Sequence, residues 1–160
     1  MAAMINADFV NSFLIASTRV LKDACGIEAK VGKPYVRENE YTDDQFLIMV
    51  GVVGEISGQV IYCFPVPVAL EIATKMCGGI MEMTEMNDIS RSAICELCNM
   101  MLGNTATVFS TKSIAIDITP PTMCTGTMKF FADKVSNICI PLSFETDKAI
   151  EINVAIKDGQ

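Results

Sequence analysis

Histidine is absent from the 160-residue chain. This absence excludes the Ser/His/Asp triad, the Cys/His dyad, histidine-based zinc sites and a phosphohistidine relay, because each of them needs an imidazole. The sequence therefore predicts chemistry that uses carboxylates, amides and hydroxyls.

Basic residues are few, since 12 lysines and arginines face 19 aspartates and glutamates and leave a formal net charge of −7. This balance argues against nucleic acid or an anionic membrane surface as the partner and favours a protein. No uninterrupted apolar run reaches the roughly 20 residues that a membrane-spanning helix needs. The N-terminus lacks the basic segment of a signal peptide, so we expect a cytoplasmic protein.

Seven cysteines are an odd number in a chain for which no export signal is predicted, so reduced and mostly buried thiols are expected. Cys95 and Cys98 form a CxxC, but neither a second CxxC nor a histidine is present to complete four zinc ligands. No metal site is therefore expected. On a helix the two sulfurs point about 60° apart, which predicts Cys98 facing inward and Cys95 at the rim.

Apolar residues make up 51% of the chain and charged residues 19%, which is ample for the core of one domain over residues 1–160. Apolar residues at helical spacing predict three helices, which run from Asn6 to Gly26, from Pro67 to Gly78, and onward from Asp88 or Ser90. Runs rich in Val, Ile, Phe and Tyr predict strands at 29–36, 45–53, 56–64, 113–118, 129–132, 138–145 and 149–156.

The order of helix, strand, proline and hairpin occurs twice, because the turn at Gly54 and Glu55 corresponds to residues 146–148 in the second half. The two copies share their pattern more than their residues, which is typical of a degenerate internal duplication. The expected fold is α/β (α+β), a two-layer domain with pseudo-twofold halves and long helices packed on an antiparallel sheet.

The third predicted helix carries a polar stripe. At about 100° per residue, Ser92, Glu96, Asn99 and Gly103 fall on one side, opposite the apolar residues Ile94, Leu97, Cys98, Met101 and Val108. Asn and Gly are poor helix formers, which cost up to about 0.7 and roughly 1 kcal/mol against Ala, so propensity does not explain their presence. A solvated helix face with Gly103 and Asn104 as a C-terminal cap would give the same spacing, and this alternative stays open.

These four residues, at spacings of four, three and four, together with Pro121 eighteen positions after Gly103, resemble the CheC/CheX/FliY phosphatases of bacterial chemotaxis. A single copy of the motif, in the second half of the chain, most resembles the CheX branch. The resemblance covers almost the whole chain.

The resemblance implies that the substrate is the aspartyl phosphate of a CheY-like receiver, which supplies its own Mg²⁺, so the chain needs no cofactor of its own. It also implies that the Glu96 carboxylate pairs with the receiver's lysine. Asn99 would hold a water in line with phosphorus, since an amide both donates and accepts hydrogen bonds. Gly103, which has no side chain, would keep the helix surface from projecting toward the receiver. Ser92 would either assist docking or be a solvated residue of the helix.

Alignment of the two halves places Ser12 and Ile15 opposite Glu96 and Asn99, so the first copy lacks the pair and one active site per chain is expected. The competing interpretation is a non-catalytic binding module like the flagellar switch protein FliM, which resembles this fold and lacks the Glu/Asn pair. The resemblance also implies a homodimer, for which apolar strands near the end of the chain would offer an edge.

Overall fold

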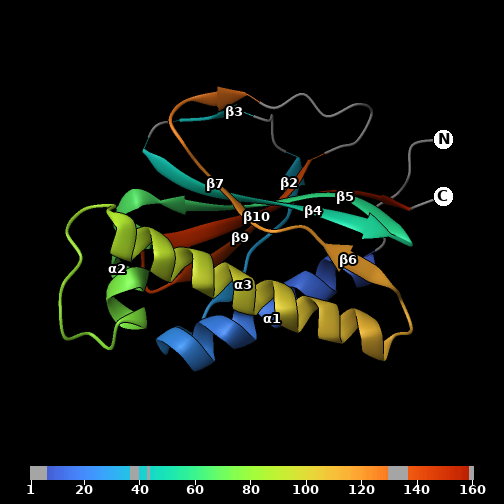
Figure 1. Cartoon of the computed structure of the whole chain (residues 1–160), viewed down its shortest axis with the longest axis horizontal. Helices are drawn as coiled ribbons and strands as arrows, with labels where there is room; N and C mark the ends of the chain where they lie inside the picture. The colour runs from blue at the N-terminus through green and yellow to red at the C-terminus, as the bar shows by residue number, and fades with distance from the viewer. Residues whose placement is uncertain (1–6, 37–39, 43, 130–136, 159–160) are drawn as a thin grey trace.

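The computed structural model describes residues 7–36, 40–42, 44–129 and 137–158. Within these residues, three helices cover one face of an eight-stranded antiparallel sheet, and a small two-stranded sheet lies on the other side (Figure 1). The predicted α+β architecture, with helices packed on an antiparallel sheet, is confirmed. No helix in the described part of the chain is long and apolar enough to cross a membrane.

The helices lie where the apolar spacing predicts them. They are α1 (Ala7–Cys25), α2 (Val66–Met76) and α3 (Asp88–Thr111), and α3 packs against both of the others. Gly26 ends α1 with a positive φ of 67°, a conformation in which glycine has no steric penalty. The predicted cap at Asn6 lies outside the described residues.

The large sheet joins the two halves of the chain through its centre. The strand order is β1-β9-β10-β5-β4-β6, with β2 beside β9 and β7 beside β4. The long hairpins β4–β5 and β9–β10 are confirmed, and β5 pairs with β10 from Ile56↔Asp158 to Cys63↔Glu151. This arrangement agrees with the predicted pseudo-twofold duplication. The strands are β1 (Lys30–Val31), β2 (Tyr35–Val36), β3 (Glu40–Tyr41), β4 (Gln45–Gly54), β5 (Ile56–Pro65), β6 (Ile116–Ile118), β7 (Thr122–Thr125), β8 (Met128–Lys129), β9 (Ile138–Phe144) and β10 (Lys148–Asp158).

Several predicted strands are shorter than expected. The segment 29–36 forms two separate pairs of strand residues, and 113–118 is extended only from Ile116 because α3 continues to Thr111 and a turn follows. Ser113 makes that turn with a positive φ of 59°. For the predicted strand 129–132, only Lys129 belongs to the described residues, where it ends β8.

The prediction that strands near the end of the chain lie at a sheet edge is wrong. β10 is paired on both sides, with β9 and β5, and β9 is covered by β1 and β2. The edges of the sheet are instead the short strands β1 and β2 on one side, and β6 and β7 on the other.

The core lies between the sheet and the helices. The α3 residues predicted to face inward are fully buried at Ile94, Leu97, Cys98 and Met101, whereas Val108 is only half-buried. Near its end α3 instead buries Phe109, whose ring packs edge-on against Phe13 of α1 with 5.6 Å between centroids. Burial of this apolar face fixes which side of α3 points to solvent.

Candidate functional site

The start of α3 is fixed by a reciprocal cap. The Asn87 side-chain oxygen accepts hydrogen bonds from the backbone N–H groups of Ile89 and Ser90, at 3.0 Å each. In return, the Asn87 N–H donates to the Ser90 hydroxyl at 2.7 Å. Such a box satisfies N–H groups that have no partner within the helix, so it sets the first residue of α3. In the sequence, the signal for this cap is an Asn three residues before a Ser. The predicted start at Asp88 or Ser90 did not use this signal.

The predicted polar stripe lies on the solvent side of α3. Ser92, Glu96, Asn99 and Gly103 are all exposed, opposite the buried apolar face. Within the described part of the chain, the side chains of Glu96 and Asn99 make no hydrogen bond or ion pair. Their carboxylate and amide groups are therefore available to another molecule.

The four side chains form a narrow ridge. At about 100° and 1.5 Å per residue, they fall within an arc of about 60° and along about 16 Å of the helix axis. Glu96 and Asn99 are about 4.5 Å apart along that axis. A carboxylate and an amide so close together can contact one phosphorylated centre from one side.

Gly103 has no structural role that the described residues require. Apart from the backbone of its own helix, a Cβ at this position would meet no atom of the described residues within 4 Å, and the φ of Gly103 is not among the positive ones. The alternative that Gly103 and Asn104 cap the helix is wrong, because α3 continues to Thr111 and its C-cap is Lys112. A glycine in the interior of an exposed helix lowers stability by about 0.5–1 kcal/mol relative to Ala, and no contact among the residues that the structure describes offsets that loss.

The alignment of the first helix with α3 needs a correction. Ser12 is fully buried, so it does not correspond to the exposed Glu96. A register in which Ile15 and Thr18 lie opposite Glu96 and Asn99 fits better, because it matches buried Phe13, Ala16, Ser17, Val20 and Leu21 with Ile94, Leu97, Cys98, Met101 and Leu102. In either register α1 lacks the Glu/Asn pair.

The two cysteines beside the ridge lie as predicted. Cys98 is fully buried, and burial raises the pKa of its thiol well above the ordinary value. Cys95 is half-buried at the rim. Among the residues that the structure describes, no group of three His, Cys, Asp or Glu side chains is arranged to hold a metal ion.

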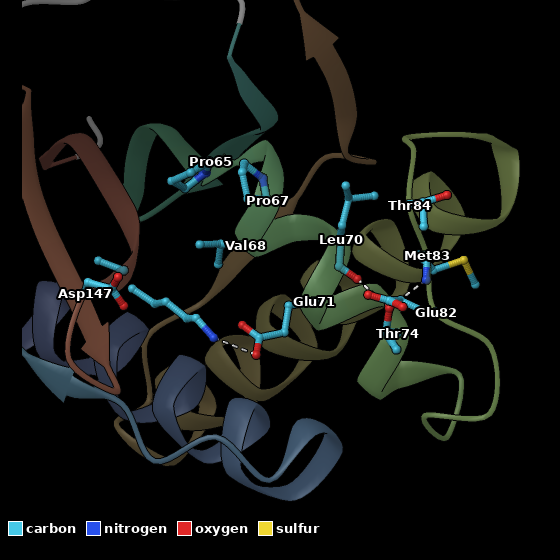
Figure 2. Close-up of a pocket in the computed structure, with 12 residues that line it drawn as sticks. Pro65, Pro67, Val68, Leu70, Glu71, Thr74, Glu82, Met83, Thr84 and Asp147 are labelled. Carbon is cyan, nitrogen blue, oxygen red and sulfur yellow. Dashed lines mark hydrogen bonds and ion pairs between the residues drawn. The ribbon is translucent and has the colours of Figure 1, made fainter.

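A pocket of about 880 Å³ opens elsewhere, between the first turns of α2, residues 82–84 and the β9–β10 turn (Figure 2). Its lining is mainly apolar, and Glu71 forms an ion pair of 2.8 Å with Lys148, which also contacts Glu145 at 2.7 Å. None of the four predicted site residues lines this pocket. The candidate site is therefore an exposed helix face outside this pocket, accessible to a partner protein.

Comparison with known proteins identifies the family. A family model described as "Chemotaxis phosphatase CheX" matches residues 46–145, which contain the whole of α3. The chain belongs to the CheX family. This confirms the resemblance that the motif indicated. A curated relative, the CheY-P phosphatase CheX of Thermotoga maritima, is 29% identical over 155 residues, which make up 97% of this chain and 99% of the relative.

Solved structures agree with the CheX assignment. A CheC-like superfamily protein from Shewanella sp. PV-4 is 26% identical and superposes with a TM-score of 0.83, covering 96% of this chain and 99% of that one. The CheX of Borrelia burgdorferi, solved in a complex with CheY, BeF3 and Mg²⁺, is 28% identical with a TM-score of 0.79. That comparison covers 96% of this chain and 100% of the other.

Proposed function

We propose that this CheX-family chain accelerates hydrolysis of the aspartyl phosphate on a CheY-like receiver in chemotaxis signalling. The observation that carries the proposal is the exposed pair Glu96 and Asn99 on α3, which has no partner among the described residues. The names of the relatives support it, since one is a CheY-P phosphatase and another was solved with CheY.

In the proposed reaction, Asn99 orients the attacking water. The amide oxygen accepts a hydrogen bond from the water and places its oxygen in line with phosphorus. The new P–O bond forms as the bond to the aspartate oxygen breaks, and a proton of the water passes to the released phosphate. The leaving carboxylate has an ordinary pKa of about 3.9 and needs no general acid, which fits a chain without histidine.

Glu96 secures the receiver in this scheme. Its carboxylate pairs with the receiver's lysine, and a charge-assisted contact of this kind fixes orientation as well as adding affinity. Mg²⁺ is held by the receiver, and we assign this chain no cofactor of its own. Gly103 lets the partner approach closely, and Ser92 extends the contact by one helical turn.

The test is phosphate release from phosphorylated CheY-like receivers. Asn99→Ala should lower kcat at least about 100-fold, by analogy with loss of other positioning groups in phosphoryl transfer. Glu96→Ala should mainly raise KM, because the receiver is held less firmly. Asn11→Ala is the matched control, since Asn11 is an exposed amide on α1.

Two outcomes would count against the proposal, once circular dichroism shows that each variant is folded. The first is that wild type releases no phosphate beyond the receiver's own rate. The second is that Asn99→Ala and Glu96→Ala act like wild type. Binding of the phosphorylated receiver without faster release would support the alternative of a non-catalytic, FliM-like binding module.

We also propose that the chain is one domain over residues 1–160, cytoplasmic, and a homodimer. The net charge of −7 favours protein partners over nucleic acid or an anionic membrane.

Exposed apolar side chains at the short edge strands β1 and β2 support an association between copies there: Val31, Tyr35 and Val36. Sedimentation should give twice the chain mass for wild type and a lower mass for Val36→Lys. A single-chain mass for wild type would contradict the homodimer.

A further inference from the structure

The exposed ridge of α3 begins with an isoleucine. Ile89 lies seven residues before Glu96, which at about 100° per residue brings the two side chains within about 20° of one direction. Together with Ile89, the four ridge residues span an arc of only about 80°. Ile89 is 54% exposed, so it is part of the same solvent-facing surface.

Nothing in the described part of the chain requires an isoleucine at this position. The cap at Asn87 uses only the backbone N–H of Ile89, and any residue except proline offers the same donor. β-branched side chains are also slightly unfavourable in helices. Single exposed apolar residues are common on proteins, so exposure alone proves little. The decisive feature is its alignment with Glu96.

The charge of this face suits a phosphorylated protein. From Asp88 to Ser110, the exposed residues in line with the ridge include two carboxylates, Glu96 and Asp88, and the Asp88 charge is balanced by Arg91, so Glu96 carries the one unbalanced charge of this face although the whole chain has a net charge of −7. A phosphoryl group is itself negative, so additional carboxylates along the ridge would repel the substrate. The ion pair between Arg91 and Asp88 has a distance of 2.6 Å at the start of the helix.

We propose that Ile89 is an apolar anchor for the phosphorylated receiver. Its side chain packs on the receiver surface beside the receiver's phosphorylation site, which Glu96 and Asn99 contact. This inference rests on the proposed function. Ile89 lies about 10 Å along the axis from Glu96, and the extended ridge from Ile89 to Gly103 is about 21 Å long. A ridge of this length is longer than a phosphate ester alone could contact, and it is long enough to form one side of a protein–protein interface. Ile89 therefore determines docking and leaves the hydrolytic step to Asn99.

The experiment compares Ile89→Ser with Ile15→Ser, because Ile15 is also an isoleucine on a helix and is 46% exposed. Phosphate release from phosphorylated CheY gives kcat and KM, and titration with BeF3-loaded CheY gives Kd. Ile89→Ser should raise KM and Kd about tenfold, as expected from loss of about half an isoleucine's burial, with kcat unchanged. Ile89→Leu should leave KM and Kd at their wild-type values, and Ile15→Ser should change neither constant.

Unchanged KM and Kd for Ile89→Ser would overturn the anchor while leaving the proposed function intact. An equal increase for Ile15→Ser would overturn it too, since the effect would then be general to surface apolar groups. If wild type binds CheY without releasing phosphate, the proposed function fails, and the Kd values alone decide the anchor. Absence of both binding and release overturns both proposals. A changed sedimentation mass with unchanged Kd would place Ile89 between copies of this chain and overturn the anchor.

Discussion

Replacement of Gly103 by alanine should make the protein more stable and less active at once. Gly103 lies in the interior of α3, with eight residues of helix after it. Outside the backbone of its own helix, an added Cβ would meet no described atom of the chain within 4 Å. The methyl group therefore has room in the isolated protein, and it removes the conformational freedom that glycine has in the unfolded chain.

The expected gain in the free energy of unfolding is about 1 kcal/mol, the usual difference between Ala and Gly inside a helix. For a chain of this length, that gain raises the midpoint of thermal unfolding by about 3 °C. The docked receiver has no such room if it approaches the helix closely at Gly103. One misplaced methyl group in a packed contact is worth about 1–3 kcal/mol, so KM should rise at least about fivefold.

Calorimetry gives the midpoint, and phosphate release from the receiver gives KM. The stability measurement is its own control, because a variant that is more stable than wild type cannot lose activity through unfolding. A lower midpoint would refute the conclusion that the fold has no need of glycine at this position. A higher midpoint with unchanged KM would refute close approach of the partner.

Two further predictions concern the core. Leu97→Ala, on the buried side of the same helix, should lose about 2–5 kcal/mol of unfolding free energy in urea titration through cavity formation. Its kcat per folded molecule should stay unchanged, and a loss below about 1 kcal/mol would contradict the packing. Burial raises the pKa of the Cys25 thiol from 9.0 to about 11, so above pH 9 the unfolded chain binds fewer protons than the folded one. Stability should therefore fall between pH 9 and 11, less steeply in Cys25→Ala, and an equal fall in the two proteins would contradict the assignment.

The sequence predicted best what a long periodic segment encodes. α3 has 24 residues and buries one face throughout, so the direction of Glu96 and Asn99 followed from spacing alone. The edge strands β1 and β2 have two residues each and are too short to show a period of two. Family resemblance supplied the chemistry, because a solvated helix face produces the same spacing as a reactive one.

The remaining errors concern contacts between distant segments. The register of α1 against α3 was wrong because a buried serine such as Ser12 looks like an exposed one in a sequence. The position of β10 inside the sheet depends on pairs such as Asn153 with Ile61, which lie more than 90 residues apart. No local pattern encodes a pairing of that range, although each hairpin was predictable from its own turn.

The central pairing of β5 with β10 also makes the two halves of the chain dependent on each other. Each half contributes one hairpin, and the seam between them joins residues 56–63 to residues 151–158. Without its counterpart, either hairpin would present a long row of unpaired backbone donors and acceptors to other chains. Because contacts so far apart in sequence form slowly, this seam is expected to close late in folding. Neither hairpin is therefore expected to form a stable sheet without the other.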